Sequence, residues 1–488
     1  MKYQADFLER RNSRILIPTS LIKDESSFEG IKKKFGVFDK GIFSYTFHAV
    51  QENLRGKMIA LPRWVERHEF ERFLCRRNIP IINNGYFINH DYIDLNLKDG
   101  CELRDNLQRN LMKFLRATHY KSIPCKSINT PTGSGKTFVS INYICETGLR
   151  PMIIVDRTSV MEQWIDRLLE FTDIEASEII KVNSGKTLTK IAHEGKNTKK
   201  GKIYITTYKS LGMVAKTFPL GVERLFRTLK IGLKLYDESH LFMKDIFNID
   251  TLADVRETIY VTATAKRSDF KERKIFKYMI PPENFSFIHK RNKEEKFLYV
   301  YLTSFNTKPT EEVRKEVEEK TRHGFNIPAY CNYIFDEKWD EFFDVIVTNL
   351  KKLYAKKILK TAIIFKKNDM IERFYDQALA IFPKAKITKF YKSPKEDKIK
   401  EIFQGDIILT NDKSFGTAVD VPNLRIMVNT SPFSSDVVAE QLSGRLREIK
   451  GKKVVFVDIA DEGFPKTKNQ RKRRLTSFKK LSKQIINN

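Results

Sequence analysis

The segment PTGSGKT at residues 131–137 constrains the fold of this chain more than any other part of the sequence. It stands between an apolar run and the helix-like pattern TFVSINYICE, so it forms the turn from a strand into a helix. Glycines let successive backbone N–H groups converge on phosphate oxygens, and the N-terminus of the following helix adds a favourable dipole. The segment therefore predicts a phosphate-binding loop at the edge of a parallel α/β sheet.

Individual side chains of this loop have separate expected roles. Lys136 can reach the β- and γ-phosphates of ATP, and the Thr137 hydroxyl can ligate Mg²⁺. The general pattern has Gly or Ala five residues before Gly135, where this chain has Thr130. We expect ATP and Mg²⁺ to be bound by Pro131, Thr132, Gly133, Ser134, Gly135, Lys136 and Thr137.

The sequence DESH at residues 237–240 follows the apolar run LKLY. A carboxylate at the end of a parallel strand lies where α/β sheets bind their ligands. Asp237 is expected to hold the Mg²⁺ ion, and Glu238 to orient or deprotonate the attacking water. The interval of about a hundred residues after Lys136 suits two strands of one nucleotide-binding sheet.

Short apolar runs alternate with helical patterns through most of the remaining chain. Continuous apolar strands separated by helices indicate parallel sheets that are covered on both faces. Two sets of runs, on either side of a charged stretch near 280–345, predict two α/β domains. The runs are MIIV (152–155), IYIT (203–206), LKLY (233–236), IYVTA (259–263), AIIF (362–365), DIILT (406–410), LRIMV (424–428) and VVFV (454–457).

Residues 1–100 have a different pattern, which predicts a separate small α+β domain. They contain a strand-like stretch at 42–50 and a helical pattern at 63–77. The run EEVRKEVEEK at 311–320 predicts a solvated helix. We expect domain boundaries that give an accessory domain at 1–100 and two α/β domains at 101–285 and 286–488.

The charge balance points to a polyanionic partner. Lys and Arg total 89 against 61 Asp and Glu, a net charge of +28, and nucleic acid is the commonest polyanion, although a generally basic proteome is the alternative. The five cysteines are scattered without a CxxC pair, which favours neither a zinc site nor a disulfide framework and suits a reducing cytoplasm. The N-terminus lacks a signal peptide and no apolar run is long enough to span a membrane, so we expect a cytoplasmic protein.

Two further segments gain meaning from the loop and DESH. The tripeptide at 262–264 ends the next predicted strand, with hydroxyls at Thr262 and Thr264. The segment QLSGRLRE at 441–448 lies too far along the chain to belong to the first nucleotide-binding domain. A second domain that closes on the first could use its arginines to stabilise charge on the γ-phosphate, whereas a solvated Arg-rich helix is the alternative.

The set PTGSGKT, DESH, TAT and QLSGR, in this order, resembles superfamily 2 helicases of the DExH type. The segments at 103–108, 155–168, 205–211 and 408–424 resemble further motifs of this family. The resemblance implies two RecA-like parallel-sheet domains in tandem, with ATP bound between them. By this resemblance the adenine and nucleotide contacts include Arg104, Gln108, Gly416 and Asp420, and the coupling residues are His240, Thr262 and Thr264. The catalytic residues of the second domain are Gln441, Arg445 and Arg447. The nucleic-acid contacts are Arg157, Gln163, Trp164, Thr206, Thr207 and Thr410.

The chain departs from the family pattern at several positions. The second arginine of the last motif would stand at 448, which is Glu448, so either Arg447 or Arg445 serves as the arginine finger. The adenine-reading pair usually stands three residues apart, whereas Arg104 and Gln108 are four apart. In the segment at 408–424 the usual second glycine is Ala418.

Within the superfamily, the QW pair and the short second domain resemble the phage UvsW-like branch-migration helicases and the XPB/Rad25-like branch. This resemblance implies a monomeric DNA translocase that acts on forked, branched or duplex DNA in recombination, repair or replication. An RNA helicase and a nucleic-acid-binding module with a vestigial ATPase stay open as alternatives. The segment at 465–484 carries nine Lys or Arg and no acid, which fits either a basic helix on the duplex or a flexible tail.

Overall fold

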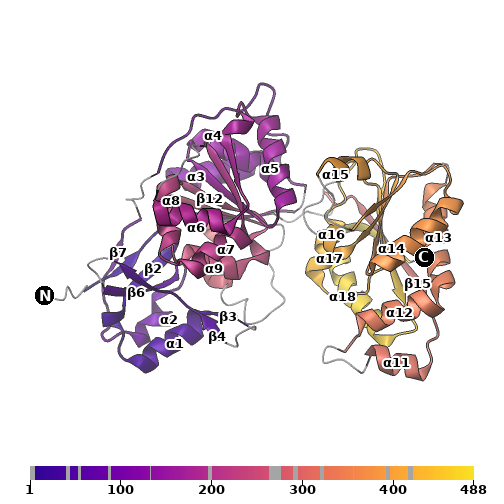
Figure 1. Ribbon diagram of the computed structural model, residues 1–488, viewed down its shortest axis with the longest axis horizontal. Coiled ribbons are helices and arrows are strands. Elements are labelled where there is room, and N and C mark those ends of the chain that lie inside the picture. The colour runs from indigo at the N-terminus through magenta and orange to yellow at the C-terminus, as the bar shows by residue number, and fades with distance from the viewer. Residues whose placement is uncertain are drawn as a thin grey trace. The chain divides into compact units, whose positions relative to one another are not determined.

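The computed structural model describes residues 6–39, 44–52, 56–85, 90–131, 133–195, 201–262, 276–289, 295–318, 324–355, 357–391, 396–415 and 421–487. The chain divides into two compact units, Met1–His289 and Lys290–Asn488 (Figure 1). Each unit contains a seven-stranded sheet, and every strand pair in the two sheets is parallel. The predicted α/β class, with two RecA-like sheets and a small α+β N-terminal region, is confirmed.

The first parallel sheet has the strand order β10-β11-β9-β12-β13-β8-β14. Its central strands are buried throughout, which explains why they read as continuous apolar runs in the sequence. Its strands are β8 (Cys125–Asn129), β9 (Pro151–Val155), β10 (Ile179–Val182), β11 (Ile203–Thr207), β12 (Leu233–Tyr236), β13 (Glu257–Thr262) and β14 (Ser286–Ile288).

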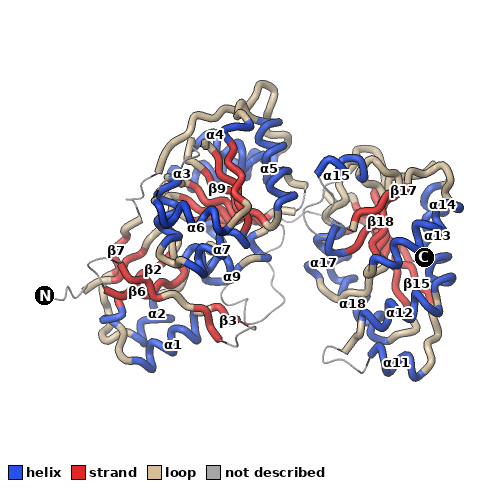
Figure 2. Tube along the Cα trace, in the orientation of Figure 1, coloured by secondary structure: helices blue, strands red, loops and turns tan. Residues whose placement is uncertain are grey.

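Helices lie on the two faces of this sheet (Figure 2). One group packs in sequence, α3 on α4 and α4 on α5, and the second group, α6 to α9, shares a hydrophobic core with alternate strand residues such as Met152 and Ile154. The helices are α3 (Asn106–Tyr120), α4 (Lys136–Thr147), α5 (Thr158–Phe171), α6 (Gly185–Glu194), α7 (Tyr208–Thr217), α8 (Gly221–Leu229) and α9 (Met243–Asp250).

The second parallel sheet has the order β17-β18-β16-β19-β20-β15-β21. The predicted apolar runs of this half form β16, β18, β19 and β20, and the predicted solvated helix is α11. The strands are β15 (Leu298–Phe305), β16 (Thr361–Phe365), β17 (Ile387–Phe390), β18 (Ile407–Asn411), β19 (Ile426–Asn429), β20 (Val454–Asp461) and β21 (Ser482–Asn487). The helices are α11 (Glu311–Glu318), α12 (Ile327–Glu337), α13 (Trp339–Tyr354), α14 (Asn368–Ile381), α15 (Glu396–Ile402), α16 (Asp412–Phe415), α17 (Asp436–Ser443) and α18 (Pro465–Leu481).

The basic C-terminal segment is part of the second unit's fold. It forms α18, and the chain then continues into β21 at the edge of the sheet. Arg474 is buried and binds Asp458 of β20 through Nε and Nη2, at 3.1 and 3.0 Å, and Phe478 is buried in the core. The alternative of a flexible tail is therefore wrong. In the part of the chain that the structure describes, this and every other helix is too short or too polar to cross a bilayer.

The N-terminal region is a five-stranded sheet of order β5-β6-β2-β1-β7 and a two-stranded ribbon of β3 and β4. The predicted strand at 42–50 is divided between β4 and β5, and the predicted helix at 63–77 is shorter, since Leu74 leaves the helical path to bridge Ile22. The strands are β1 (Leu8–Arg10), β2 (Arg14–Pro18), β3 (Val37–Asp39), β4 (Ser44–Thr46), β5 (Ala49–Glu52), β6 (Gly56–Pro62) and β7 (Ile81–Asn83), and the helices are α1 (Glu25–Phe35) and α2 (Arg67–Phe70).

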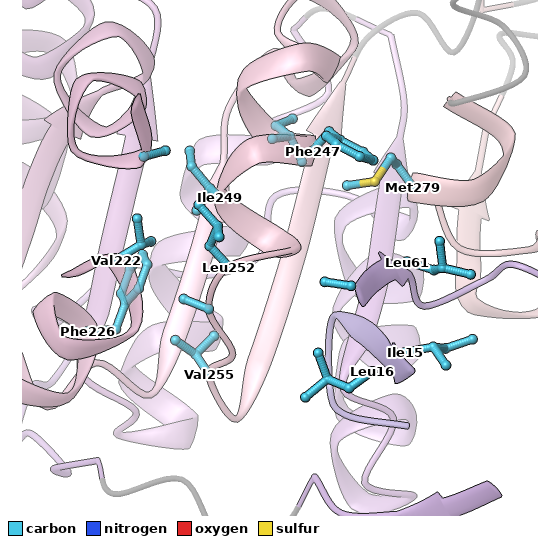
Figure 3. Packing of buried hydrophobic residues seen from close by; sticks show 14 of the residues in the cluster. Ile15, Leu16, Leu61, Val222, Phe226, Phe247, Ile249, Leu252, Val255 and Met279 are labelled. Atoms are coloured by element: carbon cyan, nitrogen blue, oxygen red, sulfur yellow. The ribbon is translucent and has the colours of Figure 1, made fainter. Parts of the chain in front are cut away.

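This N-terminal region packs firmly on the first parallel-sheet layer. Ile15, Leu16 and Leu61 belong to the same buried cluster as Val222 and Val255 (Figure 3). The fully buried Arg14 donates to Asp254 at 2.9 Å and to Glu223 at 2.6 Å. Because a buried guanidinium is costly without these carboxylates, the ion pairs fix how the region lies on α8 and on the loop after α9.

A second buried ion pair joins β8 to β13 inside the first sheet. Lys126 is fully buried and donates from Nζ to Glu257 at 2.8 Å, and His119 and the Tyr143 hydroxyl also contact this carboxylate. Burial alone would raise the pKa of Glu257, but these hydrogen bonds and the Lys126 charge lower it to about 2.

We predict that Glu257→Gln destabilises the first unit by about 3 kcal/mol, because it leaves the buried Lys126 ammonium without its counter-charge. Since the folded carboxyl has a pKa of about 2 against an ordinary 4.5, its contribution is present above about pH 4.5 and is lost as the pH falls towards 2. Urea unfolding at several pH values should show the difference from wild type shrinking over this interval. Glu170→Gln, which removes a surface pair with Arg167, should cost less than about 1 kcal/mol.

Candidate nucleotide-binding site

The phosphate-binding loop connects β8 to α4 with two glycines in the left-handed region, Gly133 at φ 83° and Gly135 at φ 80°. Lys136 begins α4, and its Nζ donates to the carbonyl oxygens of Thr130 at 2.9 Å and Pro131 at 3.2 Å. The ammonium is thus held at the centre of the loop, where its charge faces the space that phosphates would occupy. Thr132 lies outside the described residues.

Thr130, where a small residue is usual, has a specific place in this loop. It is fully buried, its hydroxyl lies 2.7 Å from the Ser134 hydroxyl, and its N–H donates to the Thr262 carbonyl at 3.3 Å. The extra side chain therefore closes the loop on itself, and the Thr130 backbone N–H attaches the loop to the end of β13.

The predicted adenine-reading segment lies directly against the loop. Asp105 caps α3 by accepting from the Gln108 N–H at 2.9 Å, and the Gln108 side chain accepts from the Arg104 N–H at 2.8 Å. A Cβ added to Gly135 would meet Gln108 Nε2 at 1.9 Å, so the amide occupies the place of a side chain there. Arg104 reaches the Gly133 carbonyl at 3.4 Å. The four-residue spacing thus still brings both side chains to the loop.

Asp237 stands at the end of β12, and both of its carboxylate oxygens are bonded. Oδ1 accepts from the Glu238 N–H at 3.0 Å, and Oδ2 accepts from the indole N–H of Trp164 at 3.0 Å. Burial and the neighbouring Glu238 raise the pKa of Asp237 to about 6, although Trp164 and the Lys136 charge oppose the rise.

The two predicted magnesium ligands are hard oxygen donors. Thr137 lies in the first turn of α4 and Asp237 at the end of β12, and carboxylate, hydroxyl, phosphate and water oxygens are the ligands that Mg²⁺ prefers. The donor set therefore fits Mg²⁺ bound together with nucleotide phosphates.

His240 joins the DESH segment to the predicted coupling strand. It is buried, and its Nδ1 lies 2.8 Å from the Thr262 hydroxyl and 3.4 Å from Glu238 Oε2. Glu238 itself has a left-handed backbone with φ 48°, which is strained for a residue with a side chain. A change in the position of Glu238 can thus be transmitted to β13 through the His240 imidazole. Thr264 lies outside the described residues.

Several predicted nucleic-acid contacts lie inside the protein instead. Trp164 is 3% exposed and points its N–H at Asp237. The hydroxyls of Thr206 and Thr410 donate to the carbonyls of Val182 and Phe390, at 2.8 and 2.6 Å. These three side chains are therefore bonded internally in this structure, and their contact with nucleic acid stays a prediction.

Of the remaining predicted contacts, Arg157 and Thr207 directly precede helices, and Gln163 lies within α5. The Thr207 hydroxyl caps α7 by accepting from the Ser210 N–H at 3.1 Å, so it too is used internally. Arg157 precedes α5, pairs with Asp156 at 2.9 Å and is 38% exposed, and Gln163 is partly exposed on the same helix. Arg157 and Gln163 thus stay accessible, whereas Thr207 does not.

The arginines of the second unit follow the end of α17. Gln441 lies in the last turn of this helix, Arg445 is buried, and Arg447 is partly exposed and donates to the Gly444 carbonyl. Both guanidinium groups are thus placed by the short turn after the helix. Gly416 and Asp420 lie outside the described residues.

The structure also adds Tyr208, which the sequence did not single out for the nucleotide site. The buried Tyr208 donates from its hydroxyl to the Asp237 carbonyl at 2.8 Å. With Trp164, this gives Asp237 one hydrogen bond from α5 and one from α7. The QW pair was visible in the sequence, but no local pattern shows that an indole 73 residues away faces the carboxylate.

The sequence profile of a family described as "Type III restriction enzyme, res subunit" matches residues 101–267. This segment contains the loop, Asp237 and His240, but not the second unit.

Curated relatives carry helicase or translocase names. The chain is 29% identical over 151 residues to a "DNA 3'-5' helicase XPB" of Kineococcus radiotolerans, which covers 31% of this chain and 25% of that protein. It is 22% identical over 422 residues to a "DNA 3'-5' translocase XPB2" of Sulfurisphaera tokodaii, which covers 78% of this chain and 86% of that one. The chain thus spans a quarter of the bacterial relative and most of the archaeal one.

Among solved structures, an "ATP-dependent Type ISP restriction-modification enzyme LlaBIII bound to DNA" matches with a TM-score of 0.52 and 13% identity, over 79% of this chain and 31% of that one. At this identity the likeness concerns the fold alone. The family profile and the curated relatives support the superfamily 2 helicase resemblance, including its XPB side. The phage UvsW-like branch stays a prediction.

We predict that Gly135→Ala weakens nucleotide binding by at least about tenfold, or about 1.4 kcal/mol, since the new Cβ must displace the Gln108 amide. Gly100→Ala is a matched control, because Gly100 has the same φ of 80° and nothing within 4 Å of its Cβ position. Titration with a fluorescent ATP analogue measures the effect. Equal affinities for the two variants would contradict a role of the Gly135–Gln108 contact in shaping the loop.

Proposed function

We propose that this chain is an ATP-dependent DNA translocase or helicase of superfamily 2. The observation that carries the proposal is the convergence, on one sheet edge, of the Lys136 ammonium, the Asp237 carboxylate and the His240–Thr262 contact. The similarity to relatives named as DNA helicases and translocases supports DNA as the track.

The residues of the first unit have distinct roles in ATP hydrolysis. Lys136 and the loop N–H groups bind the phosphates, Gln108 and Arg104 border the adenine side, and Glu238 orients the attacking water. Thr137 and Asp237 would hold Mg²⁺, which would supply positive charge next to the phosphates. Arg445 or Arg447 of the second unit, with Gln441, supplies positive charge when the two units close on ATP.

Closure and reopening of the two units drive movement along the track. The γ-phosphate favours the closed state because both units bind it, and hydrolysis removes that preference. His240 and Thr262, with Thr264, couple this change to the nucleic-acid side. Contacts go to phosphates, through Arg157 and Gln163 among others, so binding depends strongly on salt and weakly on sequence.

The finer assignment is also part of the proposal. The proposed domains are an accessory domain at 1–100 and two motor domains predicted at 101–285 and 286–488, although β14 (Ser286–Ile288) pairs with β8 and so extends the first motor domain to His289. The protein works as a monomer on forked, branched or duplex DNA. Branch migration of the UvsW-like kind in recombination, repair or replication is the cellular role that fits a motor with a small N-terminal domain.

Steady-state ATP hydrolysis tests the proposal, without nucleic acid and with matched forked DNA, linear duplex DNA and RNA. We predict low basal turnover, strong stimulation that is largest on forked DNA, and a loss of about 10²-fold or more in Lys136→Ala, since one preorganised electrostatic contact contributes on this scale. Lys113→Ala, at an exposed lysine of α3, is the matched control and should leave the rates unchanged.

Two outcomes would change the assignment. Equal or stronger stimulation by RNA would replace the DNA track with an RNA track. An absence of stimulation by every nucleic acid would favour a binding module with a vestigial ATPase.

A further inference from the structure

Asp237 is the point at which two helices meet the nucleotide site. Trp164 in the middle of α5 donates to its Oδ2 at 3.0 Å, and Tyr208 at the start of α7 donates to its backbone carbonyl at 2.8 Å. Both donors are buried, with 3% and 1% of their surface exposed. Neither hydrogen bond belongs to the loop or to the His240–Thr262 contact.

The packing around these donors is rigid. The Tyr208 ring stacks on Phe242 at 4.3 Å and on Tyr236 at 6.0 Å, which holds the hydroxyl beneath Asp237. Trp164 is buried in the first unit, and its side chain has two rotatable bonds. We therefore expect a displacement of α5 or α7 to move these donors and, through their hydrogen bonds, Asp237.

The same two helices present cations to solvent. Arg157 precedes α5 and is 38% exposed, and Lys209 in the first turn of α7 is exposed next to the buried Tyr208. Both helices begin at the carboxyl edge of the sheet, where β9 and β11 end side by side. Arg157 pairs with Asp156 at 2.9 Å, so Lys209, the Arg157 guanidinium and two helix N-termini form the part of this edge that suits phosphate groups, beside one carboxylate.

We infer that Trp164 and Tyr208 are positioning residues through which polyanion binding on α5 and α7 sets the orientation of the Asp237 carboxylate. The inference rests on the proposed function, because it assumes that Asp237 helps to hold Mg²⁺ and that nucleic acid binds this edge. It gives the stimulation of hydrolysis a path through the magnesium ligand, separate from the path through His240 and Thr262.

The geometry explains why the indole matters for orientation. The Glu238 N–H holds Oδ1 and the indole N–H holds Oδ2, so the carboxylate plane is fixed at both oxygens. Removal of the indole N–H leaves Oδ2 without this hydrogen bond, so the carboxylate can rotate about the Cβ–Cγ bond. Asp237 then coordinates a metal ion with a poorer geometry. The helix that carries the indole decides whether this restraint is present.

The test compares Trp164→Phe and Tyr208→Phe with two matched controls. Trp339→Phe removes a buried indole hydrogen bond to Gln377, and Tyr354→Phe removes a buried hydroxyl hydrogen bond to Thr361, both within the second unit. All four variants retain an aromatic ring, and thermal unfolding with each control gives the scale of any general loss of stability.

We expect Trp164→Phe to lower the ratio of DNA-stimulated to basal kcat by about tenfold, which corresponds to about 1.4 kcal/mol. The Mg²⁺ concentration for half-maximal hydrolysis on DNA should rise several-fold, while DNA affinity without nucleotide changes less than about twofold. Tyr208→Phe should act in the same direction, and the controls should change neither the ratio nor the Mg²⁺ dependence.

Fluorescence supplies a second readout, because the chain has three tryptophans. In a Trp64→Phe, Trp339→Phe protein, Trp164 is the remaining fluorophore, and forked DNA added without nucleotide should change its emission. Unchanged emission in a protein that demonstrably binds DNA would overturn the inference.

The failures of the two proposals are distinguishable. A stimulated wild type with an equally stimulated Trp164→Phe, or a variant that loses basal and stimulated rates by one common factor, removes the inference alone. A wild type that no nucleic acid stimulates removes the proposed function and the inference with it.

Discussion

Helices cover both faces of the two seven-stranded parallel sheets, and this covering confines polar chemistry to the edges where strands end. In the first unit, the carboxyl ends of β8, β12 and β13 therefore bring together residues that are far apart in sequence: the loop after β8, Asp237 after β12 and Thr262 at the end of β13. Hydrogen bonds then join these ends, through the Thr130 N–H to the Thr262 carbonyl and through His240. The site is thus a consequence of strand order.

The first sheet contains buried charges as well as apolar side chains, and these charges join its strands to each other and to a helix. Lys126 of β8 meets Glu257 of β13, and Lys234 of β12 meets Asp250, with all four side chains nearly inaccessible. Such pairs contribute little net stability compared with apolar packing, yet breaking one is costly. We infer that the Lys126–Glu257 pair acts against slippage between β8 and β13, whereas the Lys234–Asp250 pair joins β12 to α9.

The sequence predicts this architecture well and its side-chain contacts less well. Apolar runs such as 152–155 and 362–365 identify central strands because both faces of a parallel sheet are buried, and PTGSGKT identifies its loop because the backbone needs glycines there. The edge strand β21 cannot be recognised in this way, because four of its six residues, SKQIIN, are polar. The direction of the Trp164 indole could not be predicted either. The carboxylate that it binds follows β12, and the helical spacing within α5 does not identify that partner.

The basic C-terminal segment shows why buried, paired charges must be separated from exposed charges before net charge is used to infer a binding partner. Arg474 and Arg471 turn inward, to the Asp458 carboxylate and to the Asp458 and Thr303 carbonyls, so they stabilise α18 on the sheet. Lys472 and Arg473 on the same helix are exposed. The inward arginines are matched by Asp458 and add little to the external field, whereas the exposed cations act on a polyanion at long range. The net charge of +28 therefore supports a nucleic-acid partner only through the exposed cations. Helix α18 contains both exposed cations and buried, paired arginines.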